Sequence, residues 1–139
     1  MSKTWVTTAS SNVQSMTNSL TAACDHGFVP EDIHILEMVD VAQQVDTALD
    51  DASQTIRAYG GEDPDVHFTA IDEEVDFERI HHHVRSAIDE ANESGDEVAV
   101  DITPGRKFMS AIAFATGMRY DADHVFYLYI SSTDYFGRL

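Results

Sequence analysis

Along the whole chain, segments with the apolar pattern of a strand alternate with segments that have the apolar spacing of a helix. Residues 3–8 form a strand-like run, and after them Val13, Met16, Leu20 and Ala23 recur at steps of three and four residues, which is typical of one apolar face of a helix. The same change of period is repeated further along the chain. The pattern predicts strands at residues 3–8, 33–36, 66–71, 97–102 and 125–130, and helices that start near residues 13, 41, 76 and 106.

Strands that alternate with helices indicate a parallel sheet, because a parallel connection needs a crossover long enough to hold a helix. Right-handed crossovers then place helices on both faces of the sheet. We therefore expect an α/β fold, a three-layer Rossmann-like domain with a mostly parallel sheet of five or six strands. At 139 residues the chain has the size of one domain, so we expect residues 1–139 to form a single domain.

The predicted helix at residues 106–118 differs from the others because it is apolar nearly all round, from Phe108 through Ile112 to Phe114 and Met118. A helix without a polar face is buried on two sides. The sheet of so small a domain covers one side only, so we expect a homodimer in which a second copy covers the other. The alternative is a cover formed by the C-terminal segment of the same chain.

Composition restricts the partners of the domain. The chain has 25 acidic and 8 basic residues, for a formal charge of -17, and only two of the basic residues are lysines. Such a surface repels nucleic acid, so we expect no direct binding of duplex DNA. Carboxylates spread over every segment resemble adaptation to a salty, halophile-like cytosol, where salt screens the charge.

Location and covalent chemistry follow from what the sequence contains. The longest apolar runs are far shorter than a membrane span, and the first residues resemble no signal peptide, so we expect a cytoplasmic protein with no membrane partner. Cys24 is the single cysteine, which rules out an intrachain disulfide and a cysteine-based zinc site. Its position in an apolar helical stripe predicts a small core residue.

The candidate binding residues follow the first and fourth strands. In an open α/β sheet, ligands bind at the carboxyl ends of the strands where the strand order reverses, and for the order 3-2-1-4-5 these two loops meet there. Short hydroxyls, an amide and two cations beside helix N-termini predict a phosphate site. The predicted ligand-binding residues are Thr8, Ser10, Ser11 and Asn12 in the first loop, and Thr103, Gly105, Arg106, Lys107 and Ser110 in and after the second.

Simpler interpretations stay open for both loops. The serine loop alone is equally typical of helix N-capping, and Gly105-Arg106-Lys107 alone is equally typical of a helix start with a solvated charge pair. Asp101 is the only charge within the apolar run at 98–102, so we expect it to be hydrogen-bonded and structural, rather than catalytic.

Other polar clusters predict no catalytic, metal or cofactor site. Consecutive helix positions point in different directions, so His81-His82-His83 is better interpreted as a solvated helix surface than as a metal site. The acidic run Asp72-Glu73-Glu74 fits a helix start on an acidic surface. The chain has neither a Walker lysine loop nor a G-x-G-x-x-G sequence, so kinase, NTPase and dehydrogenase functions lack support, and we expect no cofactor.

The run from Asp101 to Ser110, Asp-Ile-Thr-Pro-Gly-Arg-Lys-Phe-Met-Ser, resembles the signature of CARF domains, the CRISPR-associated Rossmann-fold sensors. The Thr7–Ser11 run after the first strand and the segment at 29–36 are also similar to that family. The resemblance spans nearly the whole chain. It implies a homodimer that binds a cyclic oligoadenylate, or a related nucleotide second messenger, across its two-fold axis.

The resemblance also implies roles for individual residues. Lys107 would meet the phosphates, Thr103 and Gly105 would shape the turn, Ser110 would open the helix, and Ser10 and Ser11 would line the pocket. Two positions depart from the family pattern, because Pro104 replaces a glycine and Arg106 replaces a small hydroxyl residue. Both changes bear on the identity of the ligand.

Three functions follow from these observations. The first is a ligand-sensing domain. The resemblance also allows this domain to be the N-terminal domain of a CARF-type transcriptional regulator. The second is a metal-independent ring nuclease in which a cation stabilises the developing charge. The third is a dimerisation module that has lost its ligand. No histidine follows either loop as a general base, and this favours binding over turnover.

Overall fold

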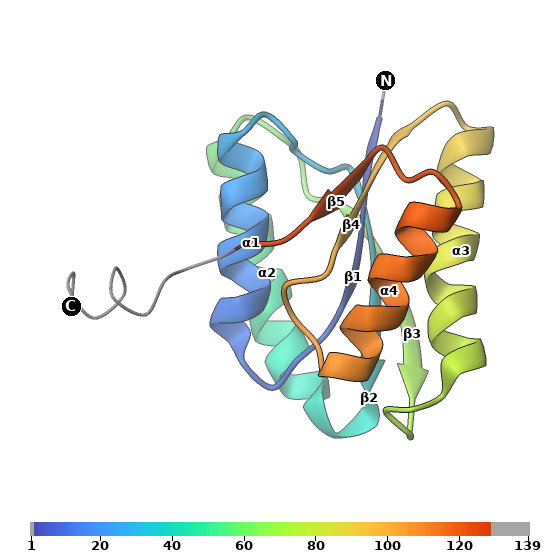
Figure 1. The fold of residues 1–139 in the computed structure, drawn as a ribbon. Helices are drawn as coiled ribbons and strands as arrows, with labels where there is room; N and C mark the ends of the chain where they lie inside the picture. Colours follow the sequence, from blue (N-terminus) through green and yellow to red (C-terminus); the bar gives the residue numbers. More distant parts are fainter. Residues whose placement is uncertain (1, 129–139) are drawn as a thin grey trace.

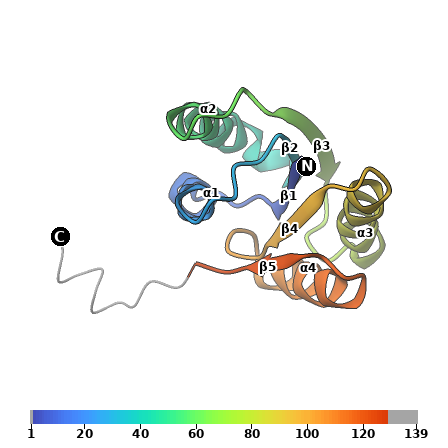
Figure 2. The same cartoon turned by 90° about the horizontal axis from the view of Figure 1, so that it is seen from above.

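Five parallel strands form one sheet between two pairs of helices in the computed structural model, which describes residues 2–128 (Figure 1). Helices α1 and α2 cover one face and α3 and α4 cover the other (Figure 2). The elements in chain order are β1 (Lys3–Thr8), α1 (Val13–Asp25), β2 (Asp32–Met38), a 3-10 helix η1 (Val39–Val41), α2 (Ala42–Ala58), β3 (Asp65–Ile71), α3 (Phe77–Glu93), β4 (Glu97–Asp101), α4 (Lys107–Arg119) and β5 (His124–Phe126).

The strand order is β3-β2-β1-β4-β5, and every neighbouring pair is parallel. This confirms the predicted three-layer α/β fold, and the order 3-2-1-4-5 is the one for which the two candidate loops were expected to meet. β5 is shorter than expected, and residues 129–130 of its predicted range lie outside the described residues. The first and fourth strands are neighbours, so their carboxyl ends form the point at which the strand order reverses.

Helix starts agree with the sequence in two cases and differ in a third. Asn12 caps α1 by accepting hydrogen bonds from the N–H groups of Gln14 and Ser15, and Asp76 caps α3 by accepting one from Arg79. From the sequence, Asp40 is the expected N-cap of the helix that starts near residue 41, and this expectation is wrong. Asp40 lies inside η1, where the backbone has already turned, and α2 begins at Ala42 without a side-chain cap.

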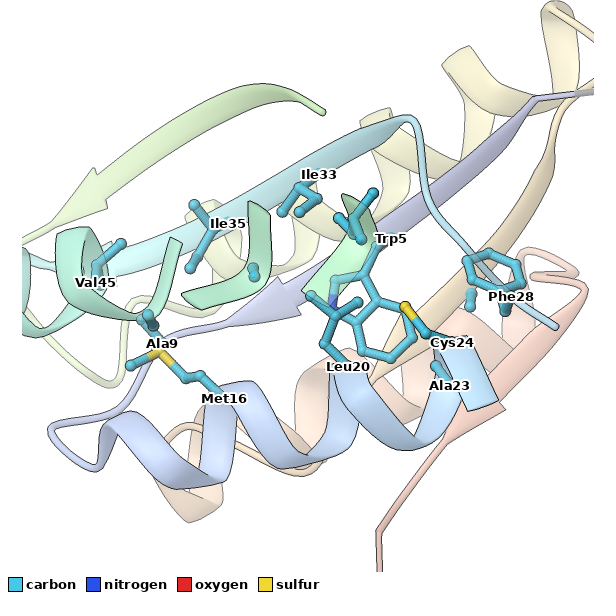
Figure 3. Packing of buried hydrophobic residues seen from close by; sticks show 14 of the residues in the cluster. Trp5, Ala9, Met16, Leu20, Ala23, Cys24, Phe28, Ile33, Ile35 and Val45 are labelled. Atoms are coloured by element: carbon cyan, nitrogen blue, oxygen red, sulfur yellow. The ribbon is translucent and has the colours of Figure 1, made fainter. Parts of the chain in front are cut away.

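The core is divided by the sheet into two halves. On the α1–α2 side, Trp5 is buried among Leu20, Cys24 and Ile33, and its ring lies 6.0 Å from that of Phe28 between centroids (Figure 3). On the α3–α4 side, a second cluster joins strand valines to α3 and α4. β1 contributes alternate residues to both halves, which explains why this central strand is buried on both faces.

α4 leaves much of its apolar surface uncovered. Met109 and Ala113 are buried against the domain, whereas Phe108, Phe114 and Met118 are 36%, 47% and 60% exposed. Residues 2–128 therefore cover this helix only in part, and the homodimer that would cover the rest stays a prediction. The alternative cover, the C-terminal segment, falls largely in residues 129–139, outside that range.

Among residues 2–128, no helix combines the length and the apolar character needed to cross a membrane.

Candidate functional site

The two predicted loops lie side by side at the carboxyl edge of the sheet. Residues 9–12 connect β1 to α1 and residues 102–106 connect β4 to α4, and β1 and β4 are paired up to Thr7 and Asp101. Both loops are at the lower end of the domain in Figure 1. The site is thus formed by segments about 90 residues apart in sequence.

The turn before α4 is built tightly around Gly105. Its φ of +94° lies in the left-handed region, and a methyl group at this position would overlap the hydroxyl oxygen of Thr8. Two hydroxyl groups, of Thr8 and Ser110, donate hydrogen bonds to the carbonyl of Pro104, at 3.1 and 3.0 Å. Thr8 is fully buried in the chain, so its hydroxyl serves the turn. Its predicted ligand contact stays a prediction.

Asp101 ties the same turn to α1. Its carboxylate accepts hydrogen bonds from the N–H of Thr103 at 3.0 Å, the hydroxyl of Ser19 at 2.8 Å and the hydroxyl of Thr7 at 3.2 Å. The side chain has no exposed surface. Burial raises its pKa to about 6, although the hydrogen bonds from Thr103, Ser19 and Thr7 oppose the rise. The expected hydrogen bonding of Asp101 is thus observed, and Ser19 of α1 is one of its partners.

The serine loop uses most of its polar groups to start α1. Besides the cap by Asn12, the hydroxyl oxygen of Ser10 accepts the N–H of Asn12 at 3.0 Å and lies 2.8 Å from that of Ser15. The capping interpretation of this loop is therefore observed. Ser11 is exposed, and its side chain makes no hydrogen bond within the described residues.

Thr103 and Ser110 are half-buried, and both hydroxyls are hydrogen-bonded within the chain. The hydroxyl oxygen of Thr103 accepts the N–H of Leu128 at 2.9 Å, so it fastens the turn to the chain leaving β5. Ser110 is bonded to Pro104 as described. These two hydroxyls organise the turn, and whether they also contact a ligand stays a prediction.

The two adjacent cations have different surroundings. Arg106 Nη1 lies 2.8 Å from Glu74 Oε2, a partner that the sequence did not indicate. Lys107, the first residue of α4, is exposed and makes no ion pair with the described residues. α4 also starts without a side-chain cap, so the first N–H groups of this helix face the site without a protein acceptor from a side chain.

His83 differs from the prediction of a solvated histidine run. His82 is exposed, but His83 is only 4% exposed and its Nε2 lies 3.1 Å from the carbonyl of Thr7, to which it donates. Burial lowers the pKa of His83 to about 4. The correction follows from helical phase, since His83 shares the sheet-facing side of α3 with Ile80 and Ala87. Within the described residues no cluster of metal-ligating side chains is present.

Comparison with known proteins is informative about the fold and the family. Residues 14–138 match the family model for CRISPR-associated protein NE0113. No curated protein matches the sequence. The structure of Can2 from Sulfobacillus thermosulfidooxidans, in complex with cyclic tetra-adenylate, is 14% identical to this chain and has a TM-score of 0.58. The match covers 91% of this chain and 32% of the Can2 chain.

Two further structures have the same fold. Enterococcus italicus Csm6, bound to cyclic hexa-2'-fluoro-hexa-dAMP, has a TM-score of 0.67 at 13% identity over 94% of this chain and 34% of its own. A type III CRISPR defence DNA nuclease activated by cyclic oligoadenylate has a TM-score of 0.58 at 14% identity. The match covers 84% of this chain and 17% of the nuclease chain. The chain therefore spans about a third or less of these structures.

At 13–14% identity, these three structures show the shared fold alone. The family match extends over most of the chain and includes the second loop of the site, residues 102–106, but not the first, residues 9–12. We conclude that the chain belongs to the family of CRISPR-associated proteins represented by NE0113.

Proposed function

We propose that this chain is a ligand-sensing domain that binds a cyclic oligoadenylate, or a related nucleotide second messenger, as a homodimer. The observation that carries the proposal is the exposed Lys107 at the uncapped N-terminus of α4, beside the point where the strand order reverses. The ligands named for Can2 and Csm6 support this ligand class.

The chemistry of the α4 start suits a phosphodiester. The first helical hydrogen bond of α4 joins the N–H of Ser110 to the carbonyl of Arg106, at 2.9 Å. The N–H groups of Lys107, Phe108 and Met109 precede it and have no acceptor within the helix. These groups, the positive end of the helix dipole and the Lys107 ammonium together favour a bound anion. We assign the phosphate contacts to Lys107 and to these backbone groups.

A second copy of the chain is the proposed cover of α4. Phe108, Phe114 and Met118 are exposed along this helix, and a cavity of about 230 Å³ lies beside it against α3, lined in part by Phe77 and Ile112. Apolar surface of this kind favours association. Phe108 is adjacent to Lys107, so an interface that includes Phe108 brings both copies of Lys107 toward one two-fold axis, where a cyclic ligand has several phosphates to offer.

Binding without turnover is the function that the site supports best, and we propose no catalytic residue. His83 contacts Thr7 of β1, beside the site. However, His83 is buried, its Nε2 donates to the Thr7 carbonyl, and its pKa is lowered to about 4. It is therefore a poor general base for a ligand at the surface. We propose that ligand binding acts on an output domain or partner, of which a transcriptional regulator is one form.

The test is the affinity of Lys107→Ala for cyclic tetra- and hexa-adenylate, measured by calorimetry in high salt. Loss of a charge-assisted contact is expected to weaken binding about 10- to 150-fold per site. Lys3→Ala is the matched control, because it removes the only other lysine and lies at the opposite end of β1. It is expected to change affinity less than about twofold.

Two outcomes would reject the proposal: no binding of either nucleotide by the parent chain, or an affinity of Lys107→Ala equal to that of Lys3→Ala. Chromatography of the ligand after incubation separates a sensor from a ring nuclease, because only the nuclease releases linear products. An absence of both binding and product, with a dimer retained, would favour the dimerisation module.

A further inference from the structure

Arg106, which replaces the small hydroxyl residue of the CARF pattern, already contacts a carboxylate of its own chain. Glu74, in the loop between β3 and α3, places Oε2 2.8 Å from Arg106 Nη1. Arg106 immediately precedes the first residue of α4. A carboxylate therefore lies beside the helix start at which we propose that a ligand phosphate binds.

The contact between Glu74 and Arg106 is close but weakly held. The two side chains are 42% and 56% exposed. The Oε2 atom is shielded from solvent, yet it has no hydrogen bond of favourable geometry with any described residue, so the contact lacks the aligned, bidentate form of a strong pair. Exposed ion pairs of this kind contribute little to stability. An incoming anion with more charge than one carboxylate can replace Glu74 at low cost.

We propose that Glu74 is an internal anion that competes with the phosphates of the nucleotide for Arg106, and so sets the affinity of the site. The inference rests on the proposed function, since it concerns the same ligand. It assigns separate roles to the neighbouring cations: Lys107, which has no ion pair within residues 2–128, is available in the ligand-free chain, whereas Arg106 becomes available when Glu74 is displaced.

Removal of the competing charge is expected to change ligand affinity in a predictable direction. Glu74→Gln keeps the size of the side chain and leaves Arg106 without its carboxylate partner, so affinity is expected to rise about 2- to 5-fold per site at low salt. If one cyclic ligand meets both copies in a dimer, the rise is about 4- to 25-fold. The gain is expected to shrink at about 1 M salt, where the Debye length is about 3 Å and the exposed pair is screened.

Glu73→Gln is the matched control for net charge. Glu73 is the exposed neighbour of Glu74 in the same loop and makes no ion pair within residues 2–128. Both substitutions change the charge of the chain equally, so any long-range effect on a polyanion is common to them. Arg106→Ala is the second background, because without Arg106 the proposed competition has no target.

The experiment is calorimetry of cyclic tetra- and hexa-adenylate with the parent chain, Glu74→Gln, Glu73→Gln, Arg106→Ala and Arg106→Ala with Glu74→Gln, at low and high salt. The inference predicts tighter binding by Glu74→Gln than by Glu73→Gln. In the Arg106→Ala background, it predicts that Glu74→Gln raises affinity by no more than Glu73→Gln does in the parent chain. Equal affinities of the two glutamine variants, or weaker binding by Glu74→Gln, would overturn the inference while leaving the proposed function in place. An absence of binding by all five proteins would overturn both.

Discussion

The backbone turn before α4 offers the most direct test of the site, through Gly105→Ala. Gly105 has φ +94°, and an added methyl group would overlap the Thr8 hydroxyl oxygen and lie 3.2 Å from Thr8 Cβ. Thr8 has no exposed surface, so it cannot swing into solvent. Its hydroxyl also holds the Pro104 carbonyl at 3.1 Å. The substitution therefore strains the backbone and disturbs the contact that shapes the turn.

The expected cost is the sum of two terms. A residue other than glycine in the left-handed region costs about 1–2 kcal/mol. Forcing a methyl group against a buried side chain typically costs about 1–3 kcal/mol, which includes any loss of the Thr8 hydrogen bond. Gly105→Ala is therefore expected to lower the free energy of unfolding by about 2–5 kcal/mol.

Gly27→Ala isolates the second term. Gly27 has nearly the same φ, +93°, but a methyl group there would have no atom within 4 Å. Both substitutions carry the backbone strain and the same reduction of unfolded-state entropy, which cancels in the comparison. Urea titration of both variants at one pH and one salt concentration is expected to show Gly105→Ala less stable by about 1–3 kcal/mol.

A double variant identifies the contact that causes the difference. Thr8→Ala removes the hydroxyl that the new methyl group would meet, so Gly105→Ala is expected to cost less in that background than in the parent. Equal stabilities of Gly105→Ala and Gly27→Ala would refute the argument that the turn is tightly packed on Thr8. So would an equal cost of Gly105→Ala with and without the Thr8 hydroxyl.

Two further predictions concern the buried carboxylate and the exposed helix face. Because burial raises the folded-state pKa of Asp101 to about 6, from 3.8, its contribution to stability is greatest below pH 3.8 and falls as the pH rises to about 6, by about 3 kcal/mol in all. Asp101→Asn removes this loss, so the variant is expected to gain stability relative to the parent between pH 4 and 7 in urea titrations at fixed salt. The comparison cancels the opposite trend of His83, whose lowered pKa is common to both proteins. A relative stability that does not change with pH would contradict the assignment. Phe114→Asp is expected to dissociate the proposed dimer without unfolding the chain, because Phe114 is 47% exposed in one copy and a charge buried unpaired in an interface costs several kcal/mol. Light scattering at high salt checks the mass, and a parent chain that is monomeric at micromolar concentration would contradict the prediction.

Local pattern was sufficient to predict the fold. The steps of three and four residues in α1 and the apolar runs of the strands depend only on neighbours in sequence, and they predicted the order of the elements. The parallel arrangement followed from the length of the connections. Gly105 and the cations at the start of α4 were also visible, because a turn of this kind and a helix N-terminus have local sequence signatures.

Most partners of the site residues were decided by tertiary structure. Asp101 bonds Ser19 across 82 positions, Thr103 is fastened to Leu128, and Arg106 is paired with Glu74. A serine within an apolar helical stripe was a weak signal for the first contact, and nothing in the local sequence selected Glu74 among its acidic neighbours. These pairs depend on the strand order, the register of β1 with β4 and the packing of α3 on α4. The sequence by itself determined which elements form and which loops carry polar groups; only the packing of those elements decided which groups are bonded inside the fold and which face a ligand, because hydrogen bonds and ion pairs depend on distances between segments remote in the chain.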